Sequence, residues 1–503
     1  MSDATMTTPS LHVAPQDRDL ASSLARQEVR DTLTAQLPAW LRPKRWFGGQ
    51  TRQITAVQIE GWLSLGESAG ADDAAPAVLC VISVTDSDGI TSRHPLFLAA
   101  TEDGTIGEAL ERPAVRQRLL ELLLGGGELR GTGLRLIGEP TGAVAGLAPD
   151  APSRIIGAQQ SNSSLVYGER AIMKVYRRLE SGANPEIELG RFLSVEAGLA
   201  AIPRVYASGR LVGDGPDLPE GFDASLLILQ AFVPNEGDGW EWSLAQGGAA
   251  LAAAEDMAGL ARWLGANPAL PDAAAELGRT TAQMHAALAA ATDAALAPHP
   301  TTAADVATWA SAVGQEAQET TAAISRAGHA DAALSQAVDA AQVYPPPEVD
   351  APGLLTRVHG DYHLGQIIRG AAGFMILDFE GEPARPLAYR RRHQHPLADV
   401  AGMARSWSYA AHAAAEGQPG KEALATTLEA TLRERFLDAY WAEADAAPTP
   451  FLPADPASRI ALLRLFELAK ALYEVRYELN NRPAMVNIPG DAVKRLMGMT
   501  NDE

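Results

Sequence analysis

Cysteine is almost absent from this sequence of 503 residues, since Cys80 is the only one. A single cysteine can form neither an intrachain disulfide nor a multi-cysteine metal site, so we expect the fold to depend on neither. Cys80 lies in the apolar run 77–84. We predict that its thiol is buried and serves as a small hydrophobic side chain.

Positive charge is also scarce. Lys and Arg total 41 against 62 Asp and Glu, which gives a formal net charge of -21 at pH 7. This balance argues against a general binder of nucleic acids or anionic membranes. The sequence has no apolar run of about 18 residues that would predict a membrane span, and no signal-peptide pattern at its start. We therefore expect a cytoplasmic protein without nucleic-acid or membrane partners, either a monomer or a weak homodimer.

Two common glycine patterns are missing. The sequence contains no G-x-x-x-x-G-K-[ST], which excludes an ordinary P-loop. Gly131-Thr132-Gly133 lacks the third glycine of a dinucleotide-binding fingerprint. Any nucleotide site must therefore be built in another way.

The character of the chain changes near residue 234. Before this point, strand-like apolar runs predominate, with helices expected over 20–37 and 108–124. After it, the sequence is rich in alanine and helical in pattern, apart from short strands expected at 356–358 and 374–377. This order predicts an α+β fold with a β-rich N-terminal half and a helical C-terminal half.

The strongest chemical signal is His359-Gly360-Asp361-x-His363-x-Gly365-Gln366, which Asp378-Phe379-Glu380 follows. Phosphoryl transfer from ATP needs a carboxylate that orients and deprotonates the attacking hydroxyl. It also needs oxygen ligands for Mg²⁺, which side-chain amides and carboxylates supply. We therefore assign Asp361 as the catalytic base and Gln366 and Asp378 as the Mg²⁺ ligands.

Two other interpretations of this segment remain. One takes its polar residues only as the turns of a hairpin. The other takes His359 and His363 as zinc ligands, because they have the i, i+4 spacing of a helical zinc pair. However, Gly360 and Gly365 do not favour a helix, and no H-E-x-x-H pattern is present. We expect both histidines to brace the loop through hydrogen bonds.

Residues before 234 carry groups suited to hold ATP. Lys174 lies inside the apolar run 171–176, and a lysine in that position needs an anionic partner unless the strand is an exposed edge. Phosphates of ATP and a glutamate of the next helix would serve, with Glu188 as first choice and Glu186 as the alternate. Further candidates are serines of a turn over the phosphates and residues beside adenine, namely Ser161, Ser163, Ser164, Gln230, Phe232 and Val233.

Together these residues resemble the aminoglycoside-phosphotransferase-like branch of the protein-kinase-like fold, and more narrowly the bacterial maltokinases. The similarity extends over about 45–489. The matching segments include Arg45-Trp46-Phe47-Gly48-Gly49, Leu277-Gly278-Arg279-Thr280-Thr281, Gly381-Glu382-Pro383-Ala384-Arg385, Asp399-Val400-Ala401-Gly402-Met403 and Lys470-Ala471-Leu472-Tyr473-Glu474. The resemblance implies two lobes, divided into a cap subdomain 1–110 with a flexible tail 1–20, a nucleotide-binding subdomain 111–234, and a helical lobe 235–503.

The resemblance also implies an activity. It implies phosphorylation of maltose to maltose 1-phosphate by ATP and Mg²⁺, feeding α-glucan synthesis, and it carries the sugar site onto Lys470, Tyr473 and Tyr477. Spacings of three and four residues place these side chains on one helix face, although such a face is also typical of a core contact. We assign His363 and Glu380, with Asp361, to the sugar as well.

Several positions depart from the maltokinase pattern. Tyr389 stands where an acidic residue is usual, Ala398 and Ala404 replace bulkier residues, and the aromatic stretch 406–409 is similar but not identical. The alternative acceptor is therefore glucosamine, or glucose, phosphorylated at the 6-position on the same scaffold. A pseudokinase that only binds its ligands is disfavoured, because the sequence contains all four residues that the phosphotransfer site needs. These are Lys174, Asp361, Gln366 and Asp378.

Overall fold

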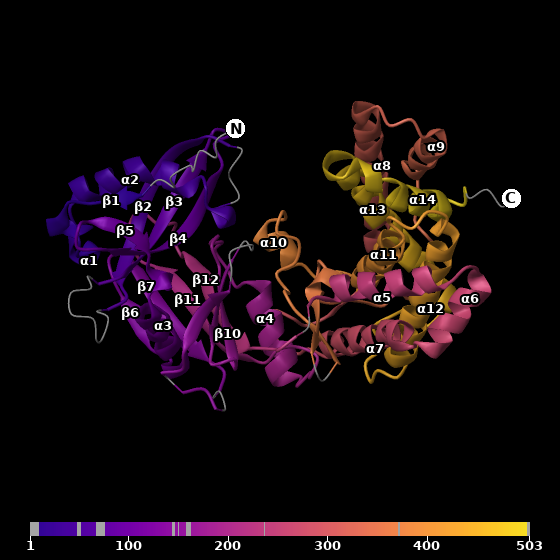
Figure 1. Ribbon diagram of the computed structural model, residues 1–503, viewed down its shortest axis with the longest axis horizontal. Coiled ribbons are helices and arrows are strands. Elements are labelled where there is room, and N and C mark those ends of the chain that lie inside the picture. Colours follow the sequence, from indigo (N-terminus) through magenta and orange to yellow (C-terminus); the bar gives the residue numbers. More distant parts are fainter. Residues whose placement is uncertain are drawn as a thin grey trace. The chain divides into compact units, whose positions relative to one another are not determined.

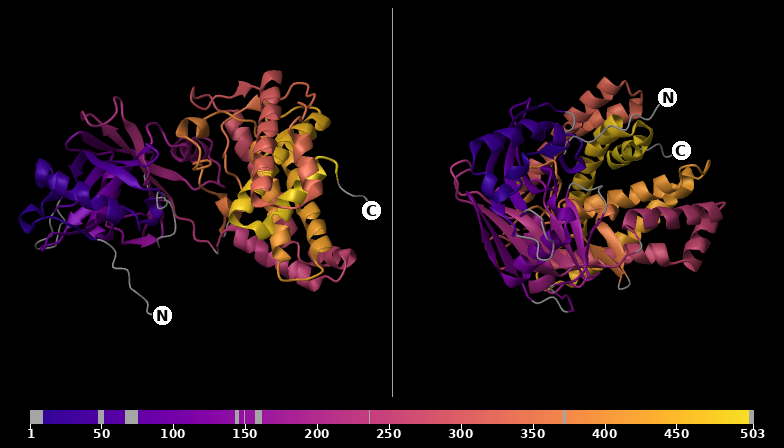
Figure 2. Two further views of the ribbon diagram at one scale, coloured as in Figure 1. Left: turned by 90° about the horizontal axis from the view of Figure 1, so that it is seen from above. Right: turned by 60° about the vertical axis from the view of Figure 1, so that its left-hand side comes forward.

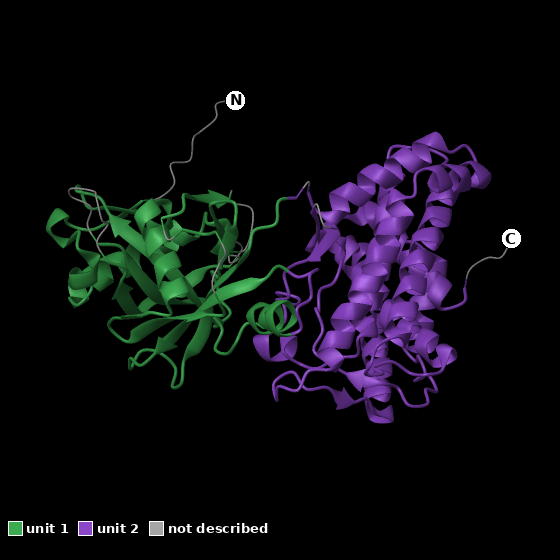
Figure 3. Ribbon diagram, turned by 90° about the horizontal axis from the view of Figure 1, so that it is seen from below, with its two compact units in different colours: residues 1–196, 203–234 green, residues 197–202, 235–503 purple. Residues whose placement is uncertain are grey.

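The computed structural model describes residues 10–47, 52–66, 76–142, 146–148, 150–156, 162–235, 237–370 and 373–499. Unit 1 comprises residues 1–196 and 203–234, and unit 2 comprises residues 197–202 and 235–503 (Figure 3). Strands predominate in the first unit and helices in the second, which confirms the expected α+β composition. Among the described residues, no helix combines the length and the apolar character needed to cross a membrane. The finer division at residue 110 stays a prediction.

Unit 1 begins with an antiparallel sheet of order β1-β5-β4-β3-β2 (Figure 1). The helices α1 and α2 pack on one face of it, where Leu33 and Leu37 meet Ile82 and Leu96 in one core. The single helix expected over 20–37 is wrong, because the chain turns between α1 and α2. The bounds are β1 Leu11–His12, α1 Leu20–Ser23, α2 Gln27–Leu41, β2 Ile54–Ser64, β3 Val78–Asp86, β4 Thr91–Ala100 and β5 Thr105–Glu108.

Strand β3 supplies side chains to two separate cores. Successive side chains of a strand point to opposite faces. Val78 and Cys80 join the core beneath α1 and α2, whereas Leu79 and Val81 join the core of the next sheet. Cys80 is buried as predicted, with 1% of its surface exposed, and burial raises the pKa of its thiol to about 12.

The second sheet of unit 1 has the order β6-β7-β11-β12-β10-β9-β8. Helix α3 packs on it through Leu119 and Leu123, and it ends at Gly126, whose positive φ of 63° suits a residue without a side chain. The bounds are α3 Pro113–Gly125, β6 Glu128–Arg130, β7 Leu134–Pro140, β8 Ser153–Ile156, β9 Ser163–Tyr167, β10 Ala171–Val175, α4 Pro185–Arg191, β11 Val205–Gly213 and β12 Asp223–Ala231.

Unit 2 is a bundle of helices with short hairpins, and Figure 2 shows its long helices side by side. Helix α13 packs against α8, α11 and α14, while α7 packs against α12. The helices are α5 Gly239–Ala253, α6 Met257–Ala266, α7 Ala269–Ala289, α8 Ala303–Ala327, α9 Ala332–Ala341, α10 Leu387–Arg390, α11 Leu397–Ala414, α12 Glu422–Asp445, α13 Pro456–Asn481 and α14 Asn487–Leu496. The strands are β13 His299–Pro300, β14 Leu354–Leu355, β15 Ile367–Gly370 and β16 Gly373–Ile376.

The strand expected at 356–358 is wrong. Thr356 forms only an isolated bridge, in which its backbone N–H and C=O bond to Gln394 at 2.9 and 2.7 Å. The strand expected at 374–377 is present as β16, which pairs with β15 in register from Ile367–Ile376 to Gly370–Gly373.

A buried ion pair joins the two sheets of unit 1. Arg177, with 2% of its surface exposed, pairs with Glu108 at 3.1 Å and donates from Nε to the Ser163 hydroxyl at 2.9 Å. Its guanidinium also lies 5.1 Å from the centre of the Trp46 ring. The aromatic motif singled out near residue 46 therefore packs around a buried cation.

We predict that Glu108→Ala lowers the free energy of unfolding by about 3–5 kcal/mol, because it leaves the Arg177 charge buried without its carboxylate. Differential scanning calorimetry measures the loss. Glu128→Ala, which breaks the exposed pair with Arg130, is the control and costs about 1 kcal/mol or less. Equal stability of the two variants would contradict the prediction.

Candidate active site

The loop that carries Asp361 is held in place by the buried carboxylate of Asp399. Asp399, near the start of α11 and 2% exposed, accepts hydrogen bonds from the backbone N–H groups of His359 at 2.8 Å and Gly360 at 2.9 Å. Gly360 has a φ of 81°, which permits the sharp turn before Asp361. The position of Asp361 is thus set by Asp399 of α11, which lies 38 residues later in the chain.

Asp399 belongs to a buried hydrogen-bond chain. Its Oδ2 lies 3.2 Å from Nε2 of His285 on α7, and Nδ1 of the same ring lies 2.9 Å from the Tyr440 hydroxyl on α12. Burial alone would raise the pKa of Asp399, but its hydrogen bonds to His285 and Gly360 outweigh burial and lower it. The carboxylate therefore stays ionised, as its role as an acceptor of two amides requires.

The two histidines of the motif brace the loop. His359, 1% exposed, has Nε2 at 2.8 Å from the Leu377 carbonyl and accepts the Asp361 backbone N–H at Nδ1 over 3.3 Å. His363 accepts the Gly365 N–H at Nδ1 over 3.0 Å. These bonds occupy both nitrogens of His359, so the zinc interpretation finds no support.

The β15–β16 hairpin brings the two expected Mg²⁺ ligands to one end. Gln366 immediately precedes β15, and its carbonyl accepts the Leu377 N–H at 2.9 Å. Asp378 follows directly and adopts a left-handed backbone with φ of 61°, a strained conformation that is typical of functional sites. Its carboxylate lies within 4.8 Å of that of Glu380. Oxygen donors of this kind fit Mg²⁺.

The role of Glu380 beside the sugar stays a prediction. Its carboxylate lies within 4.8 Å of that of Asp378, and it is not among the residues that line the cavity described next. The acidic residue of this loop that lines that cavity is Glu382.

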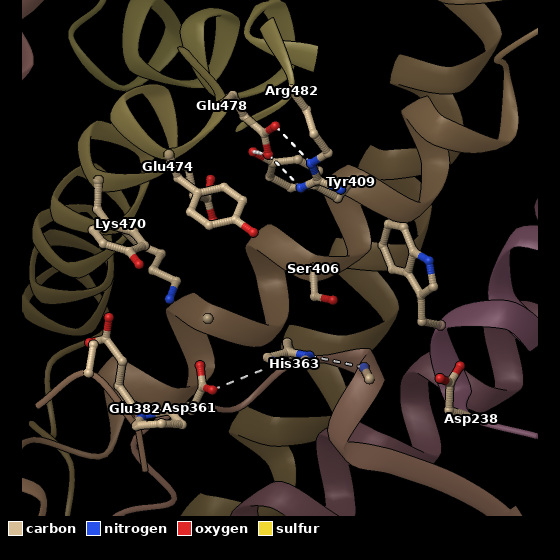
Figure 4. A pocket seen from close by; sticks show the side chains of 17 residues that line it. Asp238, Asp361, His363, Glu382, Ser406, Tyr409, Lys470, Glu474, Glu478 and Arg482 are labelled. Atoms are coloured by element: carbon tan, nitrogen blue, oxygen red, sulfur yellow. Dashed lines mark hydrogen bonds and ion pairs between the residues drawn. The ribbon is translucent and has the colours of Figure 1, made fainter. Parts of the chain in front are cut away.

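A cavity of about 690 Å³ in unit 2 gathers five of the six residues predicted for the sugar, all except Glu380. Figure 4 shows Asp361, His363 and Glu382 at one edge and the helix that carries Lys470 along one wall. The lining residues are Asp238, Trp240, Asp361, His363, Gly365, Glu382, Pro383, Ala384, Gly402, Ser406, Tyr409, Lys470, Tyr473, Glu474, Tyr477, Glu478 and Arg482.

Helix α13 presents the expected face to this cavity. The rings of Tyr473 and Tyr477 stack with centres 6.5 Å apart and an interplanar angle of 27°. Lys470 Nζ lies 5.2 Å from the centre of the Tyr473 ring. Burial and the neighbouring Glu382 carboxylate raise the pKa of Tyr473 to about 12, so its hydroxyl keeps its proton.

Sequence reasoning missed the acidic wall of the cavity. Glu474 and Glu478 directly follow the two tyrosines, and each of them accepts a hydrogen bond from a residue of α11. Arg405 Nε donates to Glu474 at 2.9 Å, and the Tyr409 hydroxyl donates to Glu478 at 3.1 Å. Arg482 also binds Glu478, at 2.6 Å. The signal available in the sequence was the i, i+4 repeat of Lys470, Glu474 and Glu478.

In unit 1, Lys174 forms an ion pair with the alternate partner, Glu186. Its Nζ lies 2.8 Å from Glu186 Oε2, which also accepts the Tyr176 hydroxyl at 2.7 Å. Asn184 caps the helix and Pro185 begins it, so Glu186 faces β10 and is buried. The first choice of Glu188 is corrected to Glu186 for this pair, and any other role of Glu188 stays a prediction.

The remaining nucleotide residues are only partly where we expected them. Ser161 lies outside the described residues. Ser163 and Ser164 belong to strand β9 instead of a turn, and Ser163 is engaged by Arg177. Gln230 lies in β12, paired with Ile172. The Phe232 N–H donates to the Arg170 carbonyl at 3.0 Å, so this amide is not available to adenine.

Contacts to ATP stay predictions at all six positions, and at Phe232 the backbone group left for adenine is the carbonyl. The six are Ser161, Ser163, Ser164, Gln230, Phe232 and Val233.

Comparison with known proteins gives a consistent result. A model of the phosphotransferase enzyme family matches residues 154–448. The chain is 32% identical over 352 residues to a glucosamine kinase of Streptacidiphilus jiangxiensis, covering 69% of this chain and 74% of that protein. It is 28% identical over 349 residues to a glucosamine kinase of Mycolicibacterium smegmatis, covering 68% and 79%.

A solved structure shares the fold. It is a glucosamine kinase in complex with glucosamine, ADP and inorganic phosphate, with a TM-score of 0.63 and 24% identity over 91% of this chain and 96% of that one. The expected kinase-like fold class is therefore confirmed.

We predict that Asp399→Asn lowers kcat by about 10–100-fold in an enzyme that remains folded, because a small displacement of the loop misplaces Asp361. Steady-state kinetics with circular dichroism as a folding check measures this effect. Asp272→Asn, on an exposed ion pair of α7, is the control. A kcat within about twofold of wild type would show that the loop does not depend on this carboxylate.

Proposed function

The chain belongs to the phosphotransferase enzyme family, and on that premise we propose that it is a glucosamine kinase, which transfers the γ-phosphoryl group of ATP to the 6-hydroxyl of glucosamine. The observation that carries this proposal is the acidic cavity beside Asp361. The chain is an ATP-dependent phosphotransferase that acts on an alcohol group. The identity of the acceptor is the part that needs an argument.

The charge of the cavity favours an amino sugar over a neutral one. Among the described residues, five carboxylates line it against two cationic side chains, Lys470 and Arg482. Arginines already pair with Glu382, Glu474 and Glu478. A bound ammonium group adds a further cation to this acidic lining, which a neutral sugar does not. Glu478, with 1% of its surface exposed, is the most deeply buried of these groups.

The names of the two relatives support the same acceptor, since both are glucosamine kinases. Maltose remains a second candidate on one observation. The stacked pair of Tyr473 and Tyr477 offers two aromatic platforms one helical turn apart, and such a surface suits a longer sugar. Maltose has no cationic group to pair with the acidic wall, so glucosamine is the better supported acceptor.

Each residue has a proposed part in the transfer. Asp361 accepts a hydrogen bond from the sugar hydroxyl and takes its proton as the oxygen attacks phosphorus. Lys174, oriented by Glu186, binds the ATP phosphates. Gln366 and Asp378 would hold Mg²⁺, with Glu380 beside them, and the ion supplies positive charge that neutralises the phosphate oxygens. Tyr473 packs against the sugar ring and Lys470 donates to its hydroxyls.

We predict that Asp361→Asn lowers kcat by at least about 100-fold, because the amide cannot take the proton of the acceptor hydroxyl. The ATP affinity, measured by calorimetry, stays close to wild type. A coupled assay of ADP release measures the rate. An asparagine variant with activity within a few-fold of wild type would remove Asp361 from its role.

We predict that glucosamine exceeds glucose, N-acetylglucosamine and maltose in kcat/KM by about 10–100-fold, since an ion-paired ammonium contributes about 1.5–3 kcal/mol. N-acetylglucosamine is the matched control, because it keeps the nitrogen but not the charge. The product should remain a reducing sugar. If maltose is preferred and its product is non-reducing, the enzyme is a maltokinase.

A further inference from the structure

Helix α8 does not line the acceptor cavity, yet it packs along helix α13, which does. Within the described part of the chain, no lining residue comes from Ala303–Ala327. The hydroxyl of Thr320, which is fully buried, lies 2.7 Å from the Glu316 carbonyl of its own helix and 3.1 Å from the Leu472 carbonyl of α13. The two helices are therefore in close contact immediately before Tyr473.

Two acidic residues of α8 bind the helix wall of the cavity. Arg476 on α13 forms ion pairs through Nη2 with Glu316 and through Nη1 with Glu319. The same guanidinium lies 5.8 Å from the centre of the Tyr473 ring. Because both amino groups of Arg476 are directed to α8, its guanidinium is held in one orientation beside the Tyr473 ring.

The opposite wall of the cavity has an ion pair of its own. Arg385 donates from Nε to Glu382 at 3.2 Å. Glu382 lines the cavity and interacts with the Tyr473 hydroxyl. The Tyr473 side chain therefore has the Arg476 guanidinium near its ring and the Glu382 carboxylate near its hydroxyl.

We propose that Glu316 is a positioning residue for the acceptor sugar, which holds Tyr473 in place on the cavity wall through its ion pair with Arg476. This inference rests on the proposed role of the cavity as the acceptor site. Glu316 is not among the residues that line the cavity. Its loss should therefore weaken binding of the sugar in the ground state and the transition state alike, which raises KM for the sugar and leaves kcat in place.

The test compares three variants of the full chain. Glu316→Gln keeps the shape of the side chain and removes its charge, and it should raise KM for glucosamine about 5–30-fold. KM for ATP and kcat should stay within about twofold. Arg476→Lys keeps the charge but loses the fork, and it should show the same separation of effects. If Glu316→Gln does not fold, Arg476→Lys tests the proposal in its place.

Glu467→Gln is the matched control. Glu467 lies on α13 and forms a similarly buried ion pair with Arg433 at 2.8 Å, but that pair points to α12 and away from the cavity lining. This variant should lose stability without a change in either KM. An unchanged glucosamine KM in Glu316→Gln, an equal rise in both KM values, or a rise in glucosamine KM for Glu467→Gln would each overturn the proposal.

The two proposals fail in different ways. If wild-type enzyme prefers another acceptor in the sugar panel, the glucosamine assignment is wrong, and the variants are then compared with the preferred sugar. A specific rise in KM for that sugar still supports the positioning role of Glu316. An unchanged KM overturns the role whichever sugar is used.

Discussion

The buried carboxylate of Asp399 is the constraint on which the phosphotransfer loop depends. It accepts two consecutive backbone amides, at His359 and Gly360, and it receives the side chain of His285 in turn. A charge so deeply buried is tolerated because every part of it is hydrogen-bonded. The catalytic loop is short and lies between two weakly paired segments, so local strand pairing would not hold it. Helices α7, α11 and α12 together define where Asp361 lies.

Helix α13 has a comparable role for the acceptor. Its inner face carries Tyr473, Tyr477 and the two glutamates that follow them. Its other faces are fastened to α11 by Arg405 and to α8 by Arg476. Cavity side chains on a rigid helix keep a more defined geometry than side chains on a loop. The acidic wall is therefore part of the packing of the bundle, and substrate selection and helix packing cannot be varied independently.

The proximity of Gln366 and Asp378 was predictable from sequence because a hairpin brings its two ends together. Gln366 and Asp378 flank paired strands, so their proximity follows from the pairing alone. The partner of Lys174 was not decided in this way. Glu186 and Glu188 both lie in the first turn of α4, and the cap at Asn184 with Pro185 determines which one faces the sheet.

The acidic wall could not be predicted from α13 alone. Glutamates on a long helix are usually solvated, and what turns Glu474 and Glu478 inward is the pair of residues Arg405 and Tyr409, about 70 residues earlier in the chain. Glu382 was within the recognised motif but was overlooked in favour of Glu380. The structure places Glu382 in the cavity lining, after a turn in which Asp378 has a left-handed backbone that no sequence pattern indicated.

Strand β3 has a consequence for how the N-terminal region folds. Since Cys80 and Leu79, one residue apart, belong to different cores, neither sheet of unit 1 can lose its structure without exposing apolar surface of the other. The first hundred residues therefore do not behave as a detachable module. A chain that begins after β3 would present one side of the second sheet without the cover of Leu79 and Val81, which is the kind of apolar surface that drives aggregation.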